Sequence, residues 1–309
     1  MSESGLAIAG DKLDGFAALE TLVCNALPSP GSRRMYRQGL RDFFSWYETS
    51  SHLRLTRNVI LEYVRYLEGR DLAASTLNLR LAAIRKMVRA AAESGMLDRA
   101  AAVELASVRN VPAAGIRVGK WLDPEEVSKI LAAPDVGKLK GKRDRALLGV
   151  LIVCGLRRDE LVRLTVEHMQ KRSRRWLIVD IQGKGNRVRT VALPAWVKEM
   201  VDTWAKASGI RAGKIFRAVH KSGAVKTSLS TAAVWQIVQG YGGKCELAPL
   251  SPHDLRRTCA KLCRAAGGDL EQIQYLLGHE SIQTTERYLG GKQELVNAVN
   301  DRIVVDSTR

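Results

Sequence analysis

The sequence lacks the features of a secreted or membrane-spanning protein. Its 5 cysteines among 309 residues are scattered, odd in number and without a CxxC pair, which argues against a disulfide framework and leaves only weak evidence for zinc at Cys259 and Cys263. No apolar run reaches the roughly 18 residues that a membrane span needs, and the longest, Ala146 to Cys154, fits a buried helix. The amino terminus has no basic region followed by an apolar one, so the sequence predicts a cytoplasmic protein.

Acidic residues are also scarce relative to basic ones. The chain has 49 Lys and Arg against 32 Asp and Glu, a net charge of +17, with an ordinary 46% of hydrophobic residues. There is enough apolar surface for a buried core, and the charge favours a polyanionic partner, most often nucleic acid. Because the basic residues are distributed and not gathered on one amphipathic segment, we expect no membrane-surface role. The charge by itself is also compatible with a protein that is merely soluble and basic.

A length of 309 residues predicts about two domains. The first hundred residues follow helical spacing, and the helix Ser75–Ala92 carries Leu77, Leu81, Ile84 and Val88 on one stripe. Its other faces carry four basic residues that are candidates for contact with a nucleic-acid backbone, or for simple solvation: Arg80, Arg85, Lys86 and Arg89.

Residues 108–120, VRNVPAAGIRVGK, combine proline, glycine and basic residues without periodicity. This composition predicts a basic interdomain linker. We therefore expect a helical domain at residues 1–107 and a second domain at residues 121–309.

The second domain mixes helices with one β-hairpin. The predicted strands Trp176–Ile181 and Val188–Leu193 flank the turn Gly183–Asn186, and an amphipathic helix is predicted in the tail at Gln293–Val299. The predicted fold class is mainly α with a small antiparallel β-sheet.

Four short motifs of the second domain contain residue types that bind phosphate or move protons. They are Gly155-Leu156-Arg157 with Glu160-Leu161, Gly183-Lys184-Gly185-Asn186, His253-Asp254-Leu255-Arg256, and Leu277-Gly278-His279 followed by Tyr288. Gly155 and Gly278 are predicted to end helices, and Glu160 is close enough to Arg157 to pair with it. Helical spacing places His253 and Arg256 on one face, opposite Leu255, so we expect both to point away from the core. Taken singly, each motif is explained as well by ordinary surface or packing residues.

Taken together, the motifs indicate one kind of chemistry. Two arginines, a lysine, two histidines and a tyrosine are what metal-free phosphoryl transfer to a tyrosine oxygen requires. No compact set of carboxylates suited to two magnesium ions competes with this interpretation.

In their residue types and their order along the chain, these motifs resemble those of the tyrosine recombinases, the phage-integrase-like site-specific recombinases. The resemblance covers roughly Asp123 to Leu289. The first domain is similar to the family's core-binding domain, most clearly from Ser75 to Lys86. The resemblance implies a helical core-binding domain followed by an α+β catalytic domain. It also implies cleavage and rejoining of duplex DNA at specific sites, by a homotetramer on two DNA sites, without cofactor, metal, ATP, small-molecule substrate or membrane.

The same resemblance implies roles for individual residues. Tyr288 would attack the scissile phosphate and leave a 3′-phosphotyrosine and a free 5′-hydroxyl. Arg157 and Arg256 would clamp the non-bridging oxygens, and Glu160 would orient Arg157.

Three further residues would move protons or bind the phosphate. Lys184 would protonate the departing 5′-oxygen, His253 would take part in proton transfer from the tyrosine, and His279 would hydrogen-bond the phosphate. Two alternatives remain at this point: a type IB topoisomerase that relaxes DNA as a monomer, and a DNA-binding regulator without catalysis.

Overall fold

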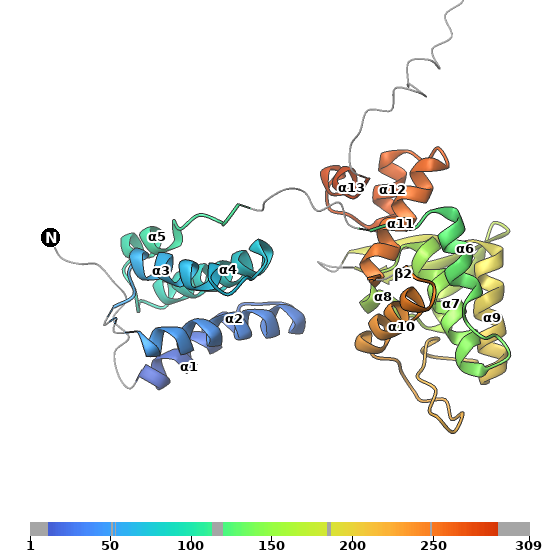
Figure 1. The fold of residues 1–309 in the computed structure, drawn as a ribbon, viewed down its shortest axis with the longest axis horizontal. Helices are drawn as coiled ribbons and strands as arrows, with labels where there is room; N and C mark the ends of the chain where they lie inside the picture. The colour runs from blue at the N-terminus through green and yellow to red at the C-terminus, as the bar shows by residue number, and fades with distance from the viewer. Residues whose placement is uncertain are drawn as a thin grey trace, which may run out of the picture. The chain divides into compact units, whose positions relative to one another are not determined.

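The computed structural model describes residues 12–50, 52, 54–112, 120–183, 187–247 and 249–289, without the side chains of residues 12–14, 287 and 288. The described residues form two compact units that divide at residue 116. Both units are helical, and a small three-stranded antiparallel sheet lies in the second (Figure 1), which confirms the predicted fold class. Within the described part of the chain, no helix is long and apolar enough to span a membrane.

The first unit is built around one central helix. Its helices are α1 (Lys12–Asn25), α2 (Pro30–Thr49), α3 (Arg57–Glu68), α4 (Ala74–Glu93) and α5 (Arg99–Ala106). Helix α4 contacts the other four, and its predicted stripe from Leu77 to Val88 is buried. Helix α5 was not predicted from the sequence. It is capped by the preceding residue, Asp98, whose carboxylate accepts the N–H groups of Ala100 and Ala101 at 2.9 and 3.2 Å.

Both described ends of the predicted linker pack onto a unit. Val108 is buried in the core of the first unit, and the Asn78 side chain bonds the backbone N–H and carbonyl of Val111 at 2.8 and 2.9 Å. In the second unit, Lys120 Nζ donates to the carbonyl of Leu247 at 2.7 Å. Residues 113–119 lie outside the described residues.

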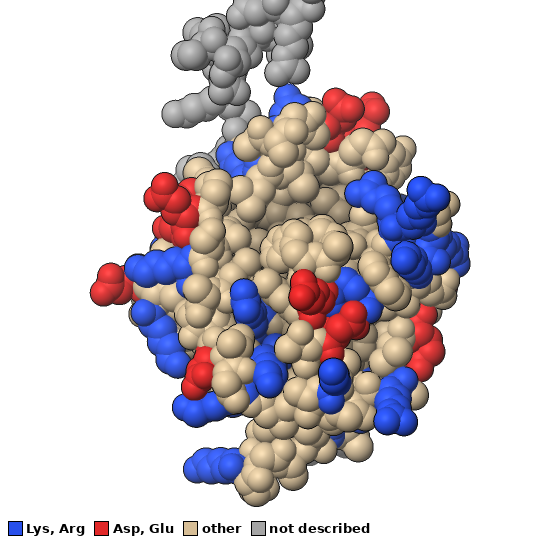
Figure 2. Space-filling model, turned by 90° about the vertical axis from the view of Figure 1, so that its right-hand side faces the viewer, with Lys and Arg blue, Asp and Glu red and all other residues tan. Residues whose placement is uncertain are grey.

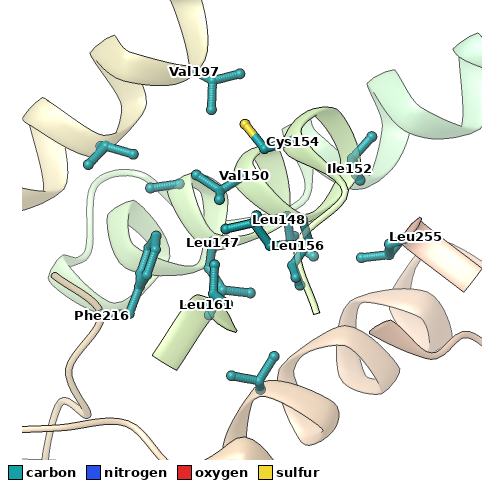
Figure 3. Close-up of a cluster of buried hydrophobic side chains, with 14 of the residues drawn as sticks. Leu147, Leu148, Val150, Ile152, Cys154, Leu156, Leu161, Val197, Phe216 and Leu255 are labelled. Carbon is teal, nitrogen blue, oxygen red and sulfur yellow. The ribbon is translucent and has the colours of Figure 1, made fainter. Parts of the chain in front are cut away.

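The second unit surrounds helix α7. Its elements are α6 (Pro124–Ala132), α7 (Leu139–Cys154), α8 (Arg158–Arg163), η1 (Val166–His168), β1 (Met169–Arg172), β2 (Arg175–Gln182), β3 (Val188–Leu193), α9 (Ala195–Ser208), α10 (Thr231–Lys244), α11 (Pro252–Ala265), α12 (Leu270–Leu277) and α13 (Ile282–Leu289). Leu147, Leu148 and Val150 of α7 are fully buried, and Figure 3 shows them among side chains such as Val197 of α9 and Leu255 of α11. The predicted buried helix at Ala146–Cys154 is confirmed.

The sheet has the strand order β1-β2-β3, with both neighbouring pairs antiparallel. The predicted hairpin is confirmed as β2 and β3, whereas β1 was not predicted. The turn from β1 to β2 consists of Ser173 and Arg174, which both adopt positive φ, 45° and 64°. Glycine or asparagine usually marks such a turn, so its sequence carries no recognisable signal.

Two helix ends set the geometry of the motifs. Helix α7 ends at Gly155 (φ 56°), where an added Cβ would lie 2.7 Å from Leu277 Cδ2. Helix α12 ends at Gly278 (φ 62°), where an added Cβ would lie 2.9 Å from Arg189 Cδ. Both predicted ends are confirmed, and both glycines allow close approach of segments distant in the sequence.

Candidate active site

The first motif forms the predicted Arg157–Glu160 pair. Arg157 Nη1 donates to Glu160 Oε1 at 2.8 Å, and the Arg157 backbone N–H donates to Oε2 at 2.8 Å. Arg157 Nη2 also reaches the carbonyl of Gly278 at 3.3 Å. The Arg157 side chain remains 34% exposed while that of Glu160 is buried, so the pair fixes the guanidinium and leaves it accessible to a ligand.

Glu160 is a charged centre in a buried place. Burial acts to raise the pKa of its carboxyl group, but the hydrogen bonds and charge of Arg189, with the bonds from Arg157, outweigh it and lower the pKa to about 2. A permanently ionised Glu160 can therefore hold both guanidinium groups at neutral pH.

Arg256 of the motif His253-Asp254-Leu255-Arg256 is buried, with 1% of its surface exposed. This corrects the prediction that His253 and Arg256 both point away from the core; His253 is exposed and Arg256 is not. The reason is that the ends of α7 and α12 cover this side of α11. Arg256 Nη1 donates to the carbonyl of Gly155 and Nη2 to that of Leu277.

The two arginines meet beside a cavity. They donate to consecutive carbonyl groups, Arg256 to Leu277 and Arg157 to Gly278. Both line a cavity of about 390 Å³ together with His253, at the start of α11. A second cavity, of about 520 Å³, is lined by residues such as Lys142 and Trp196 and contains none of the motif residues. The cavity of about 390 Å³ is therefore the candidate active site.

His279 is buried next to this cluster. Its Nδ1 bonds Thr285 Oγ1 of α13 at 3.0 Å. Burial first, and then the positive charges of Arg256 and Arg157, lower its pKa to about 3. The imidazole is thus neutral at pH 7, and α13 begins against a fixed ring.

The pKa of His253 is also lowered, first by the partial desolvation of a ring that keeps one side open to solvent, and then by the charges of Arg257 and Arg256. A neutral imidazole can accept a proton, whereas an imidazolium cannot. Partial desolvation and the neighbouring cations therefore both favour the neutral form of His253, which a general base requires.

The low pKa of His279 predicts a pH-dependent stability. The unfolded chain takes up a proton on this histidine near pH 6.5, while the folded chain does so only near pH 3. Between these values the unfolded state binds more protons, so the free energy of unfolding falls as pH falls, by up to about 1.4 kcal/mol per pH unit. We expect the free energy of unfolding of His279→Asn, measured by urea unfolding of the full chain, to change less with pH between pH 6.5 and 5 than that of the wild type.

Between pH 6.5 and 5, Glu160 contributes little to the pH dependence of stability. Glu160, whose folded pKa is about 2, loses its contribution only as pH falls below about 4.5. Equal slopes for the wild type and His279→Asn would show that the ring is not held neutral in the folded protein.

The structure does not describe the side chains of the two remaining members of the predicted set. Lys184 lies outside the described residues, and of Tyr288 only the backbone is described. The hairpin that leads to Lys184 nevertheless reaches the site, because a Cβ at Gly183 would lie 3.6 Å from Arg157 Nη1.

Helix α13, which carries Tyr288, is fixed on both sides of that residue. Thr285, three residues earlier, bonds His279 at 3.0 Å. Leu289 is buried with Leu277 in a small cluster, and its carbonyl accepts a bond from Lys261 of α11. The backbone of Tyr288 is therefore tied to the segment that carries His279.

Sequence reasoning missed Arg189, Thr285 and Trp235 at this site. Arg189 bonds Glu160 at 2.7 and 2.9 Å, and Trp235 lines the cavity with 40% of its surface exposed. A signal for Arg189 was present, because strand alternation places it in phase with the buried Val191 and Leu193.

The basic residues proposed on α4 have different surroundings. Arg80 pairs with Asp42, and Arg85 bonds the carbonyl of Val108 at 3.1 Å; Arg89 is exposed and Lys86 is half-buried. Their contact with DNA stays a prediction. On the face shown in Figure 2, Lys and Arg are spread out with Asp and Glu between them, so the net charge is not gathered there in one patch.

All five cysteines are unpaired, and four of them are buried. The described residues contain no group of three or more His, Cys, Asp or Glu side chains placed to hold a metal ion.

Comparison with known proteins places the chain in a family. Residues 120–294 match the phage integrase family, and residues 19–95 match the phage integrase N-terminal SAM-like domain. The tyrosine recombinase XerD of Pseudomonas aeruginosa is 30% identical over 83% of this chain and 85% of its own length. XerD of Ralstonia nicotianae is also 30% identical, over 82% of this chain and 81% of its own length.

Solved structures share the fold. The XerH site-specific recombinase bound to its difH substrate matches with a TM-score of 0.70 at 16% identity, over 94% of this chain and 97% of its own. A lambda integrase dimer bound to a COC′ core site matches with a TM-score of 0.69 at 17% identity, over 90% of this chain and 96% of its own. Because the match to the phage integrase family covers more than half of the chain, the chain belongs to that family, the tyrosine recombinases.

Proposed function

We propose that this tyrosine recombinase cleaves and rejoins duplex DNA at specific sites through a covalent 3′-phosphotyrosine at Tyr288. The observation that carries the proposal is the meeting of Arg157, Arg256 and His253 around one cavity. Family membership favours recombination over the two alternatives, relaxation by a topoisomerase and regulation without catalysis.

The proposed reaction is an in-line displacement at phosphorus. The Tyr288 oxygen forms a bond to the scissile phosphorus, and the bond from phosphorus to the 5′-oxygen breaks. His253 accepts the tyrosine proton, and Lys184 gives a proton to the departing 5′-oxygen. Rejoining reverses these steps with the 5′-hydroxyl of the partner strand. Because the phosphotyrosine retains the energy of the broken bond, the scheme needs no ATP.

The arginines stabilise the charge that develops in this displacement. Arg157 and Arg256 donate to the non-bridging oxygens of the five-coordinate phosphorus, and His279 adds a hydrogen bond. Their cationic groups carry out the charge compensation, so the scheme includes no metal ion. Since Glu160 and the carbonyl groups of residues 155, 277 and 278 already orient both guanidinium groups, little reorganisation is needed when the phosphate arrives.

A suicide DNA substrate, nicked so that the strand end diffuses away after cleavage, tests the proposal. The wild type should form an adduct that survives a denaturing gel, with the DNA attached to the peptide that contains Tyr288. Relaxation of plasmids without a preferred sequence would favour a topoisomerase, and absence of any adduct would favour a regulator.

We further propose a homotetramer on two DNA sites, with the two units gripping the duplex and residues 108–120 joining them. Arg80, Arg85, Lys86 and Arg89 are the proposed backbone contacts of α4, and their contribution should weaken with salt. We also propose that the enzyme acts in the cytoplasm, at the nucleoid, because its substrate is DNA.

Truncation after Gly291 tests the assembly. It removes the predicted tail helix Gln293–Val299, which lies outside the described residues. If that helix docks on a neighbouring protomer, the truncated chain should bind a single site normally and fail to bring two sites together. Normal pairing of two sites by the truncated chain would contradict that role.

A further inference from the structure

Arg189 lies on β3 and connects two other elements of the second unit. Its Nη1 and Nη2 donate to Glu160 Oε1 and Oε2 at 2.9 and 2.7 Å. Its Nε donates to the carbonyl of Leu276, the penultimate residue of α12, at 3.0 Å. The side chain is only 10% exposed, so one guanidinium binds the start of α8 and the end of α12 from the sheet.

The stem of Arg189 also shapes the segment that leads to His279. Its Cδ, Nε and Nη1 would lie 2.9 to 3.3 Å from a Cβ at Gly278. The chain can pass this close to Arg189 only because residue 278 has no side chain. His279 follows directly, so the packing of Arg189 sets where the chain leaves α12.

Glu160 is shared between two arginines with different exposures. Arg157 is 34% exposed and faces the cavity, whereas Arg189 is 10% exposed and lies behind the carboxylate. A bidentate guanidinium–carboxylate pair fixes the plane of both groups. Arg189 therefore holds the carboxylate that in turn holds Arg157.

We propose that Arg189 is a positioning residue of DNA cleavage, acting through Glu160 on Arg157 and through the end of α12 on His279. The inference rests on the proposed function, because it assigns Arg157 and His279 to the scissile phosphate. Arg189 itself does not touch the substrate in this scheme. Residues that orient a catalytic group in this way typically change activity by about 10- to 100-fold.

The first test is Arg189→Lys, which keeps the positive charge and removes the planar fork. On the suicide substrate at saturating DNA, we expect cleavage to slow by about 10- to 100-fold, with an unchanged Kd for DNA. Arg187→Ala is the matched control, because Arg187 lies two residues from Arg189 where the turn of the same hairpin closes, is 60% exposed and pairs only with the exposed Glu280 among the described residues. It should cleave at the wild-type rate.

A double-mutant cycle separates positioning from a purely structural role. If Arg189 acts mainly through Arg157, adding Arg189→Lys to Arg157→Ala should slow cleavage by no more than about twofold beyond Arg157→Ala alone. Full multiplication of the two effects would show that Arg189 does not act through Arg157 and would overturn that half of the inference, leaving only the route through the end of α12 to His279.

A third variant guards against loss of folding. Replacing Arg189 alone with an apolar residue would leave Glu160 buried beside one partner, so Arg189→Met is combined with Glu160→Gln to remove both charges. We expect this pair to fold and bind DNA but to cleave slowly, and wild-type cleavage by it would contradict the inference.

The outcomes distinguish this inference from the proposed function. Adduct formation by the wild type together with an equal rate for Arg189→Lys would overturn the positioning role alone. Failure of the wild type and of Arg187→Ala to form any adduct would overturn the proposed function, and this inference with it.

Discussion

Tyr288→Phe should form no covalent adduct with a suicide DNA substrate, a loss of at least about 10⁴-fold in cleavage. Phenylalanine lacks the oxygen that would bond to phosphorus, and no other group of the site takes its place in the proposed scheme. The ring is otherwise conserved, so folding and DNA affinity should stay as in the wild type. The measurement is single-turnover cleavage followed on a denaturing gel, with DNA binding measured in parallel.

Tyr275→Phe is the matched control for this loss. Tyr275 lies on the neighbouring helix α12 and is 68% exposed, so the same chemical change there should leave cleavage intact. An adduct that persists in Tyr288→Phe would remove Tyr288 as the nucleophile. An adduct lost equally in both variants would point to an effect on the fold of this region.

Most of the helical framework could be predicted because its signals are local. The apolar run before Gly155 and the stripe from Leu77 to Val88 both occupy the buried positions that their spacing predicts. The pairing of Arg157 with Glu160 was predictable for the same reason, since residues three apart on a helix are neighbours.

The parts that could not be predicted depend on contacts between distant segments. Spacing along α11 places Arg256 about 100° from Leu255, at the flank of the apolar stripe, and the ends of α7 and α12 bury it there. The partner of Arg189 lies 29 residues earlier in the chain, so only the assembled sheet reveals the bond. Strand β1 could not be predicted, because the turn that follows it is formed by Ser173 and Arg174, which adopt positive φ without a glycine to mark the turn.

The meeting of Arg157, Arg256 and His253 at one cavity was therefore predictable, while the contacts that hold them there were not. The sequence order of the motifs indicates which residue types meet. The carbonyl groups of Gly155, Leu277 and Gly278, which orient the two arginines, carry no residue-specific signal because every residue has one. A buried arginine held by backbone carbonyls looks the same in the sequence as an arginine on the surface.

Arg256→Ala should impair both cleavage and stability, because Arg256 has two roles in the structure. Its guanidinium donates to the carbonyl groups of Gly155 and Leu277, and the residue also lines the cavity beside Arg157. Losing one cationic stabiliser of the transition state should slow cleavage by about 10²- to 10³-fold. Losing the donors to two carbonyl groups in a buried place should lower the free energy of unfolding by about 3 kcal/mol. DNA affinity at moderate salt should change little, since many other basic residues hold the backbone.

Thr258→Ala separates these two effects. Thr258 is fully buried on the same helix, where its hydroxyl accepts the N–H of Leu122 at 2.9 Å and donates to the carbonyl of Asp254 at 2.9 Å. Its loss should destabilise the fold by about 1–3 kcal/mol without slowing cleavage at temperatures where the chain is folded. If Arg256→Ala slows cleavage no more than Thr258→Ala does, Arg256 serves the fold alone. If it abolishes DNA binding at moderate salt, its role is to position the DNA. A selective loss of cleavage, with binding retained, would place Arg256 at the scissile phosphate, because only a contact that strengthens in the transition state changes the rate without changing affinity.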